Sequence, residues 1–72
     1  MTPTATTPLD SSLLAAMRYS AQATLDLVFR HGATYRYFTV PRPVADGLAA
    51  AASKGAYFNR YIKGRFPYQR LA

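Results

Sequence analysis

Seventy-two residues with a formal net charge of +6 predict one small domain, because a chain of about this size buries only about 60% of its unfolded surface. No cysteine is present, which excludes disulfide bonds, thiolate metal sites and thiol catalysis and favours the cytoplasm. The sequence has no apolar run of about 20 residues and no charged start followed by an apolar stretch, so we expect neither a membrane span nor a secretion signal.

The positive charge is concentrated in the last third of the chain. Residues 1–46 carry four basic and three acidic groups, whereas residues 47–72 carry five basic groups and no acidic one. Such asymmetry indicates an anionic partner. Nucleic acid is the first candidate, an anionic membrane or an acidic protein is an alternative, and a charge that only serves solubility is also compatible with it.

The start of the chain predicts a tail followed by a first strand. Residues 1–11 are rich in threonine and proline, so we expect a disordered tail there and a single domain over residues 12–72. Beyond the tail the apolar residues alternate, and Leu13, Ala15 and Met17 share one side. This period of two predicts a strand with one buried face.

The middle of the chain predicts a β-hairpin. Leu25, Leu27 and Phe29 alternate with other residues, and a His-Gly pair precedes the β-branched and aromatic run of residues 34–40. Alternation of this kind is typical of a half-buried antiparallel strand, and the aromatic run is typical of its partner. The three predicted strands follow one another as a meander.

The register of this hairpin decides where Tyr35 and Tyr37 lie, since a slip by one residue moves every side chain to the other face. A two-residue turn pairs Tyr35 with Val28 and exposes both rings, as on the stacking platforms of RNA-binding sheets. A three-residue loop pairs Tyr35 with Phe29 and places both rings in the core. We favour the core arrangement, because few other large residues are available to fill it.

Two short helices are predicted after the hairpin. Pro43 suits the first turn of a helix that runs through Ala52. Ser53 can cap a second helix over residues 54–63, which Gly64 would end. The predicted fold class is therefore α+β, with a three-stranded antiparallel meander followed by two short α-helices packed on one face.

A helical projection divides the second helix into two faces. At about 100° per residue, the predicted core stripe consists of Tyr57, Phe58, Tyr61 and Ile62. The opposite face carries polar and basic side chains, namely Asn59, Arg60 and Lys63. No acidic residue offsets these cations, so we interpret this face as a phosphate-binding patch and not only as a solvated surface.

Catalysis and metal binding are not expected. The chain has one histidine, His31, and three separated carboxylates, Asp10, Asp26 and Asp46. A catalytic site needs an acid, base or nucleophile with an orienting partner, and a metal site needs several ligands at fixed spacing. We interpret His31 as a solvated turn residue and predict a protein that is not an enzyme and holds no cofactor or metal.

The candidate nucleic-acid contacts therefore come from the basic and aromatic residues of the second half. They are Arg36, Lys54, Asn59, Arg60, Lys63, Arg65, Tyr68 and Arg70, with Tyr35 and Tyr37 as possible stacking rings. Cations neutralise phosphates and rings stack on bases, so this mixture suits a single-stranded polyanion.

Several segments carry a resemblance to a known family. They are Tyr35-Arg36-Tyr37, Val40-Pro41, Ser53-Lys54-Gly55, residues 57–65 and Tyr68-Gln69-Arg70-Leu71. Over residues 12–71 the chain resembles the KTSC domain, a family named for the carboxyl end of some lysyl-tRNA synthetases and also found as small free-standing bacterial proteins. The resemblance implies an association with RNA.

The leading hypothesis is a non-catalytic RNA-binding module that contacts about five phosphates. The alternative is a protein–protein interaction module, in which a strand edge or the groove beside the C-terminal tail receives a partner segment. Peripheral binding to anionic lipid is less favoured, because few large apolar residues are expected on the exposed helix face.

Overall fold

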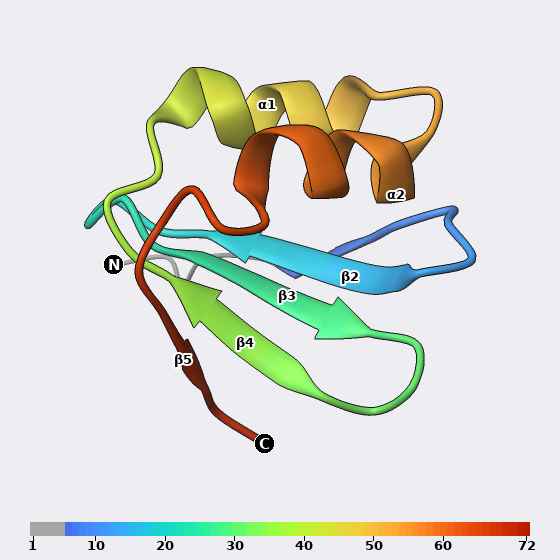
Figure 1. Ribbon diagram of the computed structural model, residues 1–72, viewed down its shortest axis with the longest axis horizontal. Coiled ribbons are helices and arrows are strands. Elements are labelled where there is room, and N and C mark those ends of the chain that lie inside the picture. The colour runs from blue at the N-terminus through green and yellow to red at the C-terminus, as the bar shows by residue number, and fades with distance from the viewer. Residues whose placement is uncertain (1–5) are drawn as a thin grey trace.

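The computed structural model describes residues 6–72, and within them a five-stranded antiparallel sheet carries the helices on one face (Figure 1). The strands follow chain order across the sheet and are β1 (Thr7–Pro8), β2 (Leu14–Tyr19), β3 (Leu25–Phe29), β4 (Thr34–Tyr37) and β5 (Tyr68–Arg70). The helices are α1 (Arg42–Ala50), α2 (Lys54–Tyr57) and the π-helix η1 (Phe58–Ile62). The predicted α+β class and central meander are confirmed, and the sheet has one further strand at each edge.

The central strands bury one face under the helices. Leu25 and Leu27 on β3 are completely buried and Phe29 nearly so, as their alternation predicts. On β2 the predicted inner face of Leu13 and Ala15 is wrong, and Leu14 is completely buried instead. A β-bulge between positions 14 and 16 shifts the register against β3, and the extra residue reverses the alternation.

The β3–β4 hairpin has a three-residue loop. The backbone N–H of Phe29 donates to the carbonyl of Ala33 at 2.8 Å, and Gly32 takes a positive φ of 108°, which glycine adopts without a steric cost. Tyr35 then lies opposite Leu27, on the helix-covered side. The prediction that both tyrosines face the core side is confirmed. Neither predicted set of cross-strand partners on β3 is correct, because the loop begins one residue earlier than expected.

The helices form where the sequence predicts them, with shorter and less regular ends. In α1, Pro43 lies in the first turn, but the helix ends at Ala50 because Ala51 already has extended backbone angles. Ser53 caps α2, since its Oγ accepts a hydrogen bond from the N–H of Ala56 at 3.3 Å. The continuous helical segment formed by α2 and η1 ends at Ile62, because Lys63 already has extended backbone angles, so the predicted end at Lys63 is one residue too late. Gly64 follows with a positive φ of 73°.

The π-turn explains one wrong assignment to the core. The N–H of Lys63 donates to the carbonyl of Phe58 at 2.8 Å, five residues back, so each residue of η1 turns through less than 100°. Phe58 and Ile62 are buried as predicted, whereas Tyr61 is 46% exposed. The wider turn moves Tyr61 off the predicted stripe and onto the surface.

The predicted disordered tail is wrong for residues 6–11, and residues 1–5 lie outside the described part of the chain. Thr7 and Pro8 pair with β2, and Leu9 is 5% exposed within the core. The guanidinium of Arg30 donates to the carbonyls of Leu9 and Ser11. One buried leucine and these hydrogen bonds hold a segment whose composition alone predicts no structure.

Over residues 6–72, every helix is too short or too polar to pass through a lipid bilayer.

Candidate nucleic-acid interface

A groove of about 550 Å³ lies between η1 and the β4–β5 edge of the sheet, on the helix-covered face. We call it the aromatic groove; its lining residues are Leu13, Phe29, His31, Tyr35, Tyr37, Phe58, Asn59, Lys63, Gly64 and Tyr68. Figure 1 shows β4 and β5 farther from the helices than β2. The helical layer therefore lies nearer to β2 than to β4 and β5, and the groove lies over the β4–β5 part of the sheet face.

The floor of the aromatic groove is a set of rings in contact with one another, most of them edge to face. The ring of Phe29 lies 5.6 Å from that of Tyr35 and 5.3 Å from that of Phe58, both nearly perpendicular to it. The Tyr68 ring lies 5.7 Å from the rings of Tyr35 and Tyr37. Such contacts add about 0.5–1.5 kcal/mol per pair beyond area burial, so the floor is held in place before any ligand arrives.

The tyrosines differ in exposure along the groove. Tyr37 is 6% exposed, and burial, followed by the nearby Tyr35 and Tyr68, raises the pKa of its hydroxyl to about 12. Tyr68 is 62% exposed on the edge strand β5. Tyr37 therefore keeps its proton at neutral pH and supports the floor, whereas Tyr68 presents its ring to the solvent.

The rim of the groove is polar and basic. Asn59 and Lys63 come from η1 and from the residue that follows it, and both are exposed. Arg65 follows in the next turn, and the guanidinium of Arg70 lies over the Tyr35 ring at 6.0 Å. Among residues 6–72, no carboxylate lines the groove, so it favours an anionic ligand.

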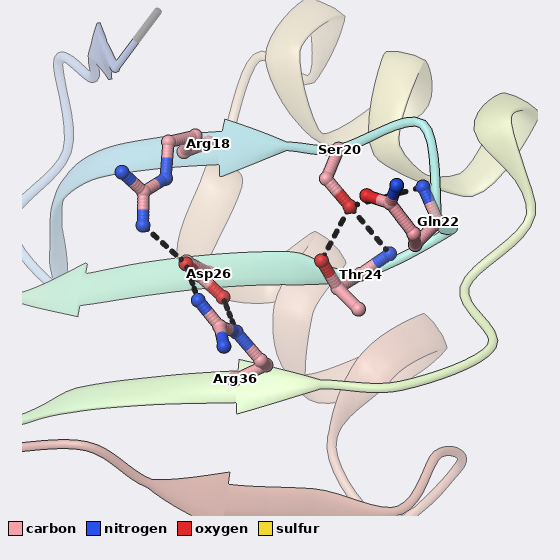
Figure 2. A network of polar contacts seen from close by, with 6 residues as sticks. All are labelled: Arg18, Ser20, Gln22, Thr24, Asp26 and Arg36. Carbon is pink, nitrogen blue, oxygen red and sulfur yellow. Dashed lines mark hydrogen bonds and ion pairs between the residues drawn. The ribbon is translucent and has the colours of Figure 1, made fainter. Parts of the chain in front are cut away.

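Arg36 lies on the opposite face of the sheet from the aromatic groove. Its guanidinium donates to the Asp26 carboxylate at 2.8 and 3.0 Å, and Arg18 donates to the same carboxylate at 2.8 Å. Figure 2 shows Asp26 on β3 between these two arginines of the neighbouring strands. The two guanidinium groups, Arg36 first, lower the pKa of the Asp26 carboxyl. We therefore leave Arg36 out of the candidate interface.

Two other predicted contacts lie away from the groove. Lys54 begins α2 and donates to the carbonyl of Ala51 at 2.8 Å. At about 1.5 Å per residue, it lies about 13 Å from Lys63 along the helical segment. Arg60 lies over the Tyr61 ring at 5.4 Å on the exposed side of η1. The residues brought together are thus Asn59, Lys63, Tyr68, Tyr35 and Tyr37, with Arg70 over the Tyr35 ring. Arg65 follows the lining residue Gly64 in the chain and is exposed.

His31 belongs to the site, although the sequence reading treats it as a solvated turn residue. It is exposed, as expected, but its ring also stacks on that of Phe29 at 5.5 Å and lines one end of the groove. Phe29 and Phe58 form the floor of the groove, whereas the sequence predicts them only as core residues. Only the tertiary arrangement reveals these three contributions.

The fold and the groove together define a small α+β domain with an aromatic, positively rimmed groove between its helical segment and its sheet edge. The chain belongs to the KTSC domain family, whose model matches residues 10–66. The resemblance found in the sequence is thereby confirmed.

Three similar proteins illustrate the settings of this domain. A lysine–tRNA ligase from a Nostoc species is 44% identical over 64 residues, which cover 88% of this chain and 11% of that ligase. A protein of Tsukamurella paurometabola is 45% identical over 60 residues, covering 82% of this chain and 90% of that protein. The crystal structure of a KTSC domain protein from Yersinia pestis superposes with a TM-score of 0.93 at 30% identity, covering 97% of this chain and all of that one. The chain thus spans only about a ninth of the ligase it matches.

Proposed function

We propose that this domain is a non-catalytic RNA-binding module of the bacterial cytoplasm, which contacts RNA through the aromatic groove and its basic rim. The observation that carries the proposal is the placement of Lys63 and Asn59 at the edge of a cluster of aromatic rings with no carboxylate among the described lining residues. Phosphates favour the cation, and bases favour the rings.

The relatives support this proposal in a second way. The matched segment makes up 11% of lysine–tRNA ligases from two Nostoc strains, and a lysine–tRNA ligase acts on a tRNA. A small basic domain attached to that enzyme is well placed to add affinity for RNA by raising its local concentration. A free-standing copy would retain the binding surface without the catalytic unit.

The absence of catalysis is part of the proposal. Within residues 6–72, no three histidine, cysteine, aspartate or glutamate side chains lie together as metal ligands would. The Asp26 carboxylate is engaged by Arg18 and Arg36 on the face away from the groove. His31 lines the groove without a carboxylate among the other described lining residues, so it lacks the carboxylate partner that commonly orients a catalytic histidine.

A protein-interaction module is the second candidate. It is favoured by β5, a three-residue edge strand whose residues are all exposed, and by the exposed apolar side chains of Tyr68 and Leu71 beside it. Edge strands of this kind can accept a further strand from a partner. The aromatic groove with its cationic rim is the stronger observation, because backbone pairing at an edge requires neither rings nor positive charge.

The test compares two double variants that remove the same charge. Lys63→Ala with Arg65→Ala and Arg42→Ala with Lys54→Ala each lower the formal charge from +6 by two, to +4. Only the first pair includes a lining residue of the groove, Lys63, and Arg65 follows the lining residue Gly64. Fluorescence anisotropy with a labelled single-stranded RNA should show a loss of affinity of about tenfold for the first pair and less than about threefold for the second.

Two results would overturn the proposal. One is a wild-type protein that binds no RNA at about 50 mM salt, where phosphate contacts are strong; this result would favour the protein-interaction module. The other is an equal loss for the two double variants, because binding would then depend on net charge and not on the groove.

A further inference from the structure

We infer that the aromatic groove takes one unpaired nucleotide, with its base among the rings and its phosphate at Lys63 and Arg65. This inference rests on the proposed function and extends it from RNA in general to single-stranded RNA. It also assigns the groove a selective role, in addition to the electrostatic attraction of its rim. Free nucleotides share the same chemistry, and a titration with mononucleotides distinguishes them from a nucleotide within an RNA chain.

The size and shape of the groove fit one nucleotide. Its volume of about 550 Å³ falls within the range of about 300–1,000 Å³ that small-molecule sites occupy. The groove is open to solvent along the β5 side, where Tyr68 is 62% exposed. A base can therefore enter from the edge of the sheet while the strand to which it belongs remains outside.

The ring of Tyr68 is available for stacking. Its plane makes angles of 74° with the Tyr35 ring and 37° with the Tyr37 ring, so neither neighbour covers its face in a parallel stack. Base stacking on one aromatic side chain typically changes affinity by about five- to a hundredfold when the ring is removed. Tyr68 is accordingly the main stacking residue of the groove.

Two polar groups of the groove are free to bind the edge of a base. Among residues 6–72, the amide of Asn59 and the hydroxyl of Tyr37 make no hydrogen bond to another residue, and no fully enclosed side-chain polar atom lacks a partner. Both groups therefore contact the solvent, and both belong to residues that line the groove. An amide and a hydroxyl offer both donors and acceptors, as the edges of unpaired bases require.

An unpaired base is required by this arrangement. In a duplex, the faces of each base are stacked on neighbours and its pairing edge is occupied, so neither the Tyr68 ring nor the Asn59 amide could reach it. The phosphates of a duplex would still contact Lys63 and Arg65 from outside the groove. Duplex RNA should consequently bind by charge alone.

The experiment measures the affinities of the full chain for a single-stranded oligoribonucleotide and for its duplex, with two pairs of matched variants. Tyr68→Ala removes the groove ring, and Tyr61→Ala removes an exposed tyrosine outside the groove. Asn59→Ala removes the groove amide. Gln69→Ala removes an exposed amide on the other side of the sheet, because residue 69 lies opposite Arg36 in the β4–β5 register. Circular dichroism checks that each variant stays folded.

We expect the wild type to bind the single strand about tenfold more tightly than the duplex, and Tyr68→Ala to abolish this preference. Asn59→Ala should reduce discrimination among oligonucleotides of different base composition, whereas Tyr61→Ala and Gln69→Ala should behave as the wild type. Equal binding of duplex and single strand by the wild type, or an unchanged preference in Tyr68→Ala, would overturn the inference. The proposed function would survive that result if Lys63→Ala with Arg65→Ala still weakened binding.

Titration with 5′-mononucleotides distinguishes the two sources of the nucleotide. Nuclear magnetic resonance shifts confined to groove residues at millimolar nucleotide would support the groove as a site that also accepts the free compound. A preference for single strands without such shifts would support a nucleotide held within an RNA chain. Shifts confined to residues outside the groove would overturn the assignment of the site.

Discussion

Gly47 lets the helices α1 and α2 approach each other closely. In the middle of a helix a glycine lowers stability by about 1 kcal/mol relative to alanine, so its presence in α1 requires a reason. A Cβ atom at this position would lie 2.7 Å from the Cζ atom of Tyr57. The same ring is fixed by its hydroxyl, which donates to the carbonyl of Val44 at 2.9 Å. Gly47 therefore makes room for an aromatic side chain that joins α2 to α1.

A comparison of two helical glycines tests this reading. Gly47→Ala should lower the free energy of unfolding by about 1–3 kcal/mol, since the clash with Tyr57 outweighs the gain in helix propensity. Gly55→Ala should raise it by about 0.4–1 kcal/mol, because a Cβ there would lie 3.6 Å from that of Leu13, an ordinary contact. Urea denaturation measures both changes. A stabilising effect of Gly47→Ala would show that the Tyr57 ring moves aside freely.

At the scale of elements, Asp26 joins the three central strands. It lies on β3, is only 6% exposed, and accepts hydrogen bonds from Arg18 on β2 and Arg36 on β4. Three neighbouring strands are thus connected by one carboxylate on the face that no helix covers (Figure 2). Removing the negative charge would leave both guanidinium groups without their shared charged acceptor, so the three strands would lose this connection.

This network predicts a specific dependence of stability on pH. The folded pKa of Asp26 is lowered, mainly by its hydrogen bonds from Arg36, so its contribution is complete above the unfolded pKa of about 3.9 and is lost as pH falls through the folded pKa. Asp26→Asn should lower the free energy of unfolding at pH 7 by about 2 kcal/mol. It should also flatten the loss of stability below about pH 4.

The matched control for this prediction is Asp46→Asn. Asp46 is exposed and lies 3.9 Å from Arg42, so its replacement should change the free energy of unfolding by less than about 0.5 kcal/mol. Chemical denaturation at several pH values measures both variants. If Asp26→Asn loses stability below about pH 4 as steeply as the wild type, the assigned role of the carboxylate is contradicted.

The elements that the sequence predicts well are those with a local signal. The alternation in β3, the cap at Ser53 and the stop at Gly64 are each visible within a few residues. The edge strands β1 and β5 are only two and three residues long, and they exist because a neighbouring strand offers free backbone groups. The bulge in β2 and the π-turn in η1 each displace a single residue, which no regular period can predict.

The candidate site shows the same limit. Sequence charge and aromatic content indicate Lys63, Asn59 and Tyr68, and the groove brings these three together. Arg36 is predicted to belong to the site but lies on the other face of the sheet, whereas His31 is not predicted there but lines the groove. The hairpin register and loop decide which of these side chains faces the helices. The groove draws on five separate stretches of the chain, so its outline depends on packing and cannot be read from any one motif.

The acidic groups of the protein do not compensate the positive charge on the groove side. Asp26 offsets arginines on the far face of the sheet, and Asp46 lies next to Arg42 at the start of α1. Over residues 6–72, no ion pair involves Arg60, Lys63, Arg65 or Arg70. The surplus of positive charge is therefore concentrated around the C-terminal half of the helical segment and the edge strand.

This distribution sets the expected salt dependence of RNA binding. Three cations assigned to the groove, namely Lys63, Arg65 and Arg70, and about −0.7 per phosphate contact on a single strand give a slope of log affinity against log salt of roughly −2. Lys63→Ala with Arg65→Ala should reduce its magnitude by about 1.4, and Arg42→Ala with Lys54→Ala should leave it nearly unchanged. Anisotropy titrations between about 50 and 200 mM salt measure the slope. A slope near zero in the wild type would show that phosphates do not contribute, and an equal reduction in both variants would show that the contacts are spread over the whole surface.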